Sequence, residues 1–105
     1  MRENIVEIKS RDYWFKIVEF LQQNWALIDP NNGGYRVFFF DDTSGVFDYL
    51  NFDSLDEAEL ALKRNGFKRF SEDKEAQEFI GIPELPFYER PLPHGPIYSS
   101  GRYWK

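Results

Sequence analysis

The chain has 105 residues, with 18 acidic and 13 basic side chains, 42% hydrophobic residues and no cysteine. This length suits one compact domain, and the apolar content is too high for a disordered chain. Without cysteine there is no disulfide, no cysteine-containing zinc site and no cysteine nucleophile. The single histidine, His94, excludes a two-histidine metal site.

The net charge and the N-terminal residues limit the cellular compartment and the binding partners that we expect. No apolar run approaches the length of a membrane span, and the N-terminal residues lack the apolar stretch of a secretory signal. We therefore expect a cytoplasmic protein that makes no contact with a membrane. The formal charge of −5 disfavours binding to nucleic acid or anionic lipid and favours a basic partner.

The first regular pattern predicts a long helix over residues 10–28. Apolar residues recur there at steps of three or four, as one face of an amphipathic helix requires: Trp14, Val18, Leu21, Trp25 and Ile28. Ser10 would cap this helix, and the run Asp-Pro-Asn-Asn-Gly-Gly over residues 29–34 would end it. Residues 5–8 are a candidate strand.

Two β-rich runs follow, over residues 35–40 and 46–52, with turn-forming residues 41–45 between them. They predict an antiparallel hairpin. Strict alternation would place Val46, Asp48, Leu50 and Phe52 on one face of the second strand, and Phe47 and Tyr49 on the other. Asp48 would then be partly buried, with Arg36 across the hairpin as its hydrogen-bond partner.

A second helix is predicted over residues 54–65, because Ser54 and Glu57 form a capping box and Asn65-Gly66 can end the helix. A short strand over residues 67–70 and an acidic helix over residues 71–80 complete a compact unit of residues 1–80. Ser71 would cap that helix, with Ala76, Phe79 and Ile80 turned inward. Residues 81–105 hold five of the six prolines and many aromatic residues, which favours an extended segment lying across the domain or a partner.

Together these elements predict an α+β fold. A small antiparallel β-sheet would pack against a long N-terminal helix and a second helix. The extended Pro-rich C-terminal segment, residues 81–105, would pack on the same domain.

The acidic residues are unevenly distributed. Seven of them, and no basic residue, lie between residues 41 and 60. Such segregation favours a contact surface for a cationic protein, although hairpin loops and first helix turns are also ordinary places for acidic residues. The candidate contact residues are Asp41, Asp42, Asp48, Asp56 and Glu57, with Tyr88, Tyr98, Tyr103 and Trp104 as aromatic anchors.

No pattern in the sequence points to catalysis, a metal or a cofactor, and we expect none of these. Residues 41–45 depart from a calcium-binding loop, because Asn51 stands where that loop needs a glutamate. An acidic hydrolase that uses Asp48 with Asp41 or Asp42 is the enzymatic alternative.

Nucleic-acid binding and self-association also stay open. The basic and aromatic segment 63–70 could bind RNA or another nucleic acid through Arg64, Phe67, Lys68 and Arg69. Its order departs from the aromatic motif of the RNA-recognition fold, because Lys68 stands where glycine or alanine is expected. A structural subunit could instead self-associate through the C-terminal segment.

In size, acidity and lack of catalytic residues, the chain resembles the small acidic immunity proteins with which bacteria neutralise their own toxins, including those of contact-dependent inhibition systems. The segments that carry the resemblance are DDTSGVFDYLNFDSLDE and PFYERPLPHGPIYSSGRYWK. The resemblance implies a cytoplasmic, non-catalytic inhibitor that binds a basic toxin domain, often a nuclease, and blocks its active site or substrate surface.

Overall fold

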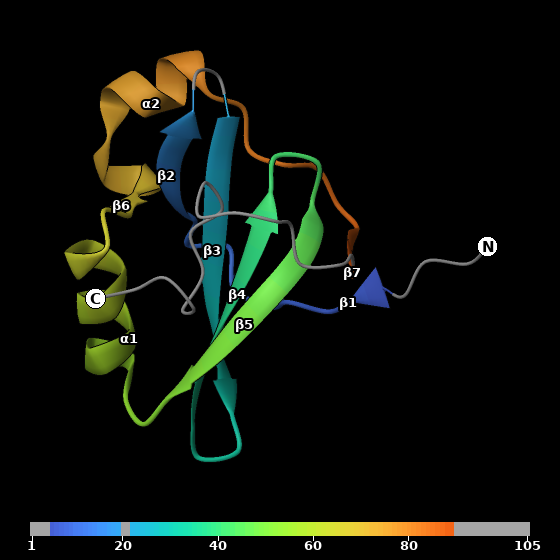
Figure 1. Cartoon of the computed structure of the whole chain (residues 1–105), viewed down its shortest axis with the longest axis vertical. Coiled ribbons are helices and arrows are strands. Elements are labelled where there is room, and N and C mark those ends of the chain that lie inside the picture. Colours follow the sequence, from blue (N-terminus) through green and yellow to red (C-terminus); the bar gives the residue numbers. More distant parts are fainter. Residues whose placement is uncertain (1–4, 20–21, 90–105) are drawn as a thin grey trace.

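The computed structural model describes residues 5–19 and 22–89, which form one seven-stranded mixed sheet and two short helices (Figure 1). The strands are β1 (Ile5–Val6), β2 (Trp14–Glu19), β3 (Gln22–Asn31), β4 (Gly34–Asp41), β5 (Gly45–Phe52), β6 (Lys68–Arg69) and β7 (Phe87–Glu89). The helices are α1 (Leu55–Arg64) and α2 (Lys74–Phe79), and a 3-10 turn, η1 (Phe70–Glu72), precedes α2. The predicted α+β fold with a long N-terminal helix is therefore wrong.

The order of the strands is β1-β7-β5-β4-β3-β2-β6. Strands β2 to β5 follow one another as an antiparallel meander. Strand β7 pairs parallel to β5, and it also pairs antiparallel to β1 on its other side. The two ends of the described chain therefore complete one side of the sheet together.

Residues 10–28 contain the hairpin of β2 and β3 instead of the predicted helix. Trp14 lies opposite Ala26, and Phe15 lies opposite Trp25. Neighbouring side chains join two different buried clusters, because they point to opposite faces of the sheet. Because apolar residues of β2 and β3 lie on both faces of the sheet, some of them also recur at the steps of three and four residues that are typical of a helix. The abundance of aromatic and β-branched residues favours strands, and packing on both sides stabilises them.

The turn from β3 to β4 lies where the sequence predicted the end of a helix. Asn32 and Gly33 have φ angles of 48° and 82°, and both central residues of a type I′ hairpin turn need such positive values. At Gly34, an added Cβ would lie 2.5 Å from the backbone oxygen of Phe52. The close approach of β4 and β5 at this end therefore requires glycine.

The hairpin predicted from residues 35–40 and 46–52 is confirmed as β4 and β5. Strict alternation along β5 is wrong, however. Phe39 lies opposite Asp48 and Phe40 opposite Val46, so Phe47 is the extra residue of a β-bulge. Val46 consequently packs on the opposite face from Phe47, Leu50 and Phe52.

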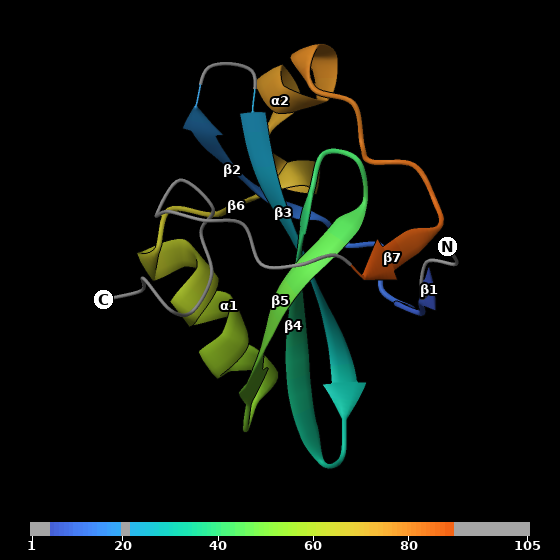
Figure 2. The same cartoon turned by 45° about the vertical axis from the view of Figure 1, so that its right-hand side comes forward.

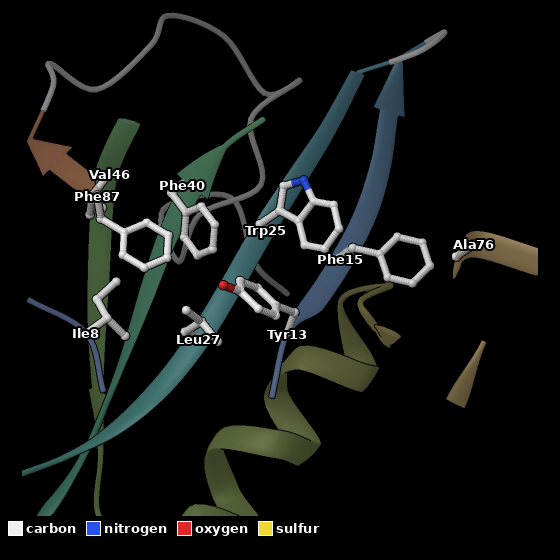
Figure 3. Close-up of a cluster of buried hydrophobic side chains, with 9 residues drawn as sticks. All are labelled: Ile8, Tyr13, Phe15, Trp25, Leu27, Phe40, Val46, Ala76 and Phe87. Carbon is white, nitrogen blue, oxygen red and sulfur yellow. The ribbon is translucent and has the colours of Figure 1, made fainter. Parts of the chain in front are cut away.

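Both faces of the sheet are covered. On the α1 face, Ala58 and Leu62 of α1 and the following Phe67 pack on the sheet residues Trp14, Ala26, Ile28, Val37, Phe39 and Phe47. On the α2 face, Ala76 of α2 lies among the residues Ile8, Tyr13, Phe15, Trp25, Leu27, Phe40, Val46 and Phe87 (Figure 3). Helix α1 lies beside the lower half of the sheet and α2 at its upper end (Figures 1 and 2).

The remaining predicted elements are confirmed in part. Ser54 caps α1 by accepting a hydrogen bond from the backbone N–H of Glu57 at 3.2 Å. Helix α2 is shorter than predicted, and Asp73, not Ser71, caps it. Within it Ala76 is buried as expected, but Phe79 is 79% exposed, so its predicted inward position is wrong.

The described part of the C-terminal segment belongs to the domain. Pro83 and Phe87 are buried, and β7 is a strand of the sheet. Residues 90–105 lie outside the described residues, and with them His94 and the predicted anchors Tyr98, Tyr103 and Trp104.

Candidate functional site

The acidic residues of the segment 41–60 are spread along β5. Asp42 is exposed in the turn before this strand, and Asp48 is half-buried within it. Asp56 and Glu57 are exposed in the first turn of α1, beyond the other end of β5. Eight residues of strand separate these ends by roughly 25 Å. The structure does not bring the predicted acidic residues into one surface.

Asp41 shapes the turn between β4 and β5. It is 5% exposed, and its Oδ1 accepts hydrogen bonds from the backbone N–H groups of Thr43 at 2.9 Å and Gly45 at 3.0 Å. The Thr43 hydroxyl donates to the same oxygen at 2.7 Å. A carboxylate held in this way orders the loop and is not available as a surface contact.

Asp48 and Arg36 do not lie opposite each other. In the register of β4 and β5, Arg36 lies opposite Asn51 and donates to its Oδ1 at 2.9 Å. The Arg36 guanidinium also lies 4.3 Å from the ring centre of Tyr49. Asp48 lies opposite Phe39 and accepts a hydrogen bond from the backbone N–H of Tyr49 at 2.8 Å. The predicted cross-strand pair is therefore not in register.

Tyr88 occupies a structural position in β7. Its backbone N–H donates to the Ser44 carbonyl at 3.1 Å, and its hydroxyl lies 3.3 Å from the Thr43 hydroxyl. The ring is half-buried. Of the four predicted aromatic anchors, this is the one within the described residues, and it fastens β7 to the β4–β5 turn.

In the basic and aromatic segment 63–70, neighbouring carboxylates pair with Arg69, whereas Lys63, Arg64 and Lys68 are exposed. Arg69 lies 3.1 Å from Asp12, 2.5 Å from Glu59 and 3.4 Å from Glu72, and its guanidinium stacks 4.5 Å from the Trp14 ring centre. Burial opposes the charge, yet these carboxylates hold the pKa of Arg69 above its ordinary value. Arg69 thus joins three parts of the fold, which disfavours a role in binding phosphate.

Sequence reasoning missed an exposed apolar surface on α2 and the chain that follows it. Phe79, Ile82 and Leu85 are 79%, 44% and 56% exposed. Exposed carboxylates lie among them in the sequence. We call this set the α2 surface: Glu75, Glu78, Phe79, Ile82, Glu84 and Leu85. It extends over the upper end of the molecule, from α2 toward β7 (Figure 1).

The α2 surface lies in an acidic part of the described chain, and buried residues support it from below. Residues 70–89 contain six acidic residues and one basic residue. Below the exposed side chains, Ala76, Pro83 and Phe87 are buried. The Ser44 hydroxyl donates to the Glu84 carbonyl, which ties the segment to the β4–β5 turn. Beside Ile82 lies a shallow groove of about 440 Å³, also lined by Arg11, Tyr13, Phe70, Ser71 and Gln77.

Within residues 5–19 and 22–89, no group of three His, Cys, Asp or Glu side chains could hold a metal ion. The two described helices are too short and too polar to cross a membrane. Comparison with family models, with curated proteins and with solved structures found no match. Function has to be inferred from the residues themselves.

Proposed function

We propose that this chain is a non-catalytic protein-binding module that binds a basic protein through the α2 surface. One observation carries the proposal. Three large apolar side chains, Phe79, Ile82 and Leu85, are exposed within seven residues of each other, in the part of the chain with six acidic residues and one basic residue.

The combination of apolar anchors and surrounding charge is typical of protein interfaces. Aromatic and aliphatic residues bury well in the centre of an interface, while charged residues fit its rim. Phe79 would be the central anchor, because it exposes the largest fraction of its side chain. Carboxylates on the rim would attract a cationic partner and orient it before contact.

The buried residues that hold the α2 surface in place also support its role as a binding surface. A contact segment that is already ordered loses less conformational freedom on binding than a mobile one. Here Pro83 and Phe87 anchor the segment in the sheet, and Ser44 holds the Glu84 backbone. The exposed side chains are thus presented on a backbone that the fold has already positioned.

A toxin inhibitor is the form of this function that we propose. A nuclease toxin domain binds nucleic acid and therefore needs a cationic substrate surface. An acidic protein with apolar anchors can occupy such a surface and exclude the substrate. This interpretation agrees with the resemblance to small acidic immunity proteins.

The proposal can be tested by affinity capture from the native cell lysate at low and high salt, with nuclease-treated samples beside untreated ones. We expect one basic protein in stoichiometric amount, retained after nuclease treatment and weakened by salt. Phe79→Ser should weaken its affinity about 30-fold or more, the effect of losing an interface residue worth about 2 kcal/mol. The variant should fold normally, because Phe79 is mostly exposed.

Leu60→Ser provides the matched control. Leu60 lies on α1 and is 53% exposed, so the substitution removes a similarly exposed apolar side chain elsewhere on the molecule. The control should bind as the unmodified protein does. Capture of nucleic acid alone, capture of the chain alone, or equal weakening by both variants would refute the proposed surface.

A further inference from the structure

A groove lies on the α2 face of the sheet, beside the β3–β4 turn at the lower end of Figure 1. Strands β3 and β4 form its floor, where Arg36 lies opposite Asp29 and the half-buried Phe38 packs against the buried cluster of this face. Pro30 and Asn31 complete the β3 side. The groove has a volume of about 400 Å³, which is within the range of small-molecule binding sites. Helix α2 lies at the upper end of the same face, away from the groove (Figure 1).

The chain between β1 and β2 forms the other wall of the groove. This connection crosses the α2 face, because β1 lies at one edge of the sheet, β2 lies near the other, and Ile8 and Tyr13 are buried in the cluster of this face. Asp29 holds the wall in place. Its two carboxylate oxygens accept hydrogen bonds from the backbone N–H groups of Lys9 at 2.7 Å and Ser10 at 2.8 Å. The carboxylate of Asp29 is therefore engaged in the fold, and the exposed side chain of Lys9 stays beside the groove.

Arg36 presents an oriented guanidinium group to this groove. Its Nε donates a hydrogen bond to Asn51 Oδ1 at 2.9 Å, and the guanidinium carbon lies 4.3 Å from the centre of the Tyr49 ring. Its two terminal nitrogens, Nη1 and Nη2, make no hydrogen bond or ion pair with residues 5–19 and 22–89. These two nitrogens form a planar fork that matches the two oxygens of a carboxylate. Asn51 and Tyr49 thus hold in advance the orientation that a carboxylate ligand needs.

The charges of the groove suit a ligand with one negative charge. Lys9 and Arg36 are positive and Glu7 is negative, while two backbone N–H groups already satisfy the Asp29 carboxylate. A doubly charged phosphate would be repelled by Glu7 and Asp29 more strongly than a single carboxylate. The groove therefore favours a carboxylate over a phosphate.

The apolar part of the lining indicates what the carboxylate is attached to. Phe38 and Pro30 line the groove together with Arg36, and a flat ring packs well on such side chains. We propose that the groove binds a small aromatic carboxylate. Its two oxygens accept hydrogen bonds from the Arg36 Nη atoms, its ring packs on Phe38 and Pro30, and Lys9 adds a second positive charge. This site is independent of the proposed function, because the α2 surface lies at the other end of the molecule.

Benzoate is the probe that tests this proposal, with the full chain followed by ¹⁵N NMR. We expect saturable shifts of the Arg36 Nε–Hε signal and of the backbone signals of Lys9 and Phe38, with a Kd on the order of 1 mM. Benzamide has the same shape without the charge, so it should bind about 10-fold more weakly or less. Inorganic phosphate should also bind more weakly than benzoate. No saturation by benzoate, equal binding of benzamide, or tighter binding of phosphate would overturn the proposal.

Two arginine variants test whether the benzoate site is this groove. Arg36→Gln should weaken benzoate binding about 10-fold or more, because an amide lacks both the charge and the fork. Arg64→Gln removes an exposed arginine on α1 and should leave the affinity unchanged. Unchanged binding to Arg36→Gln, or equal weakening by both variants, would refute the site. The backbone signals of Ala58 and Leu62 report whether each variant keeps the fold, and the comparison of benzoate with benzamide in the unmodified chain does not depend on a variant.

Discussion

Gly34 offers the sharpest test of the sheet. Replacing it with alanine would place a Cβ 2.5 Å from the carbonyl oxygen of Phe52, while ordinary contact begins at 3.4 Å. The strands β4 and β5 would have to separate by about 0.9 Å at this end, the difference between those distances. A hydrogen bond of normal length, stretched by that amount, is effectively broken. Overpacking and one lost hydrogen bond together should lower the free energy of unfolding by about 2–3 kcal/mol.

Substitutions at two other glycines distinguish the steric clash expected at Gly34 from backbone strain. Gly33 has a φ of 82° but no atom within 4 Å of an added Cβ, so Gly33→Ala should cost only about 1–2 kcal/mol for the left-handed conformation. Gly81 has neither a positive φ nor a close neighbour. Gly81→Ala should therefore leave stability unchanged or raise it by up to about 1 kcal/mol.

Urea unfolding, followed by the fluorescence of the buried Trp14 and Trp25, measures these differences. In thermal melts Gly34→Ala should lower the Tm by roughly 10–20 °C. The expected order of stability is Gly81→Ala, then Gly33→Ala, then Gly34→Ala. A Gly34→Ala variant as stable as Gly33→Ala would show that the β4 and β5 backbones are not in close contact at this end.

Two further substitutions test buried polar groups. Burial raises the pKa of Tyr13 above its ordinary value, and Arg11 opposes the shift. The neutral side chain therefore stabilises the fold below about pH 10. This contribution is lost as the pH rises through the raised pKa. The Tm of the unmodified protein should therefore fall more between pH 9 and pH 11 than the Tm of Tyr13→Phe, and equal falls would contradict the burial of the hydroxyl. Arg69→Lys should lower the free energy of unfolding, measured in urea, by about 1–3 kcal/mol. A single lysine ammonium cannot replace the planar guanidinium, whose nitrogens reach Glu59 and two other carboxylates. The exposed Arg64→Lys should change stability by less than about 0.5 kcal/mol, and a similar loss in both variants would refute this role of Arg69.

Local signals predicted the parts of the fold that depend on neighbouring residues. The Ser54 cap, the end of α1 and the β4–β5 hairpin all follow from short sequence patterns. Asn32-Gly33 was also such a signal, because this pair is typical of a type I′ hairpin turn. Interpreting it as the end of a helix concealed the hairpin of β2 and β3 and the wider sheet.

Other features depend on contacts between distant residues. The bulge at Phe47 reverses the alternation along β5, and no single residue in the sequence marks it. Phe79 lies three residues after the buried Ala76, a spacing that places both on one helix face. The helix nevertheless ends at Phe79, which stays exposed. The candidate surface was missed for this reason, and composition predicted only its acidity.

The position of β7 has a consequence for the synthesis of the protein. Strands β2 to β5 pair with their neighbours in sequence and can assemble as soon as residue 52 is available. Strand β1, although made first, pairs only with β7 among the described strands, and more than 80 residues separate Ile5 from its partner Tyr88. Such distant pairings form late and slow folding. On the ribosome, β1 must therefore wait unpaired until β7 has also been made and has left the exit tunnel.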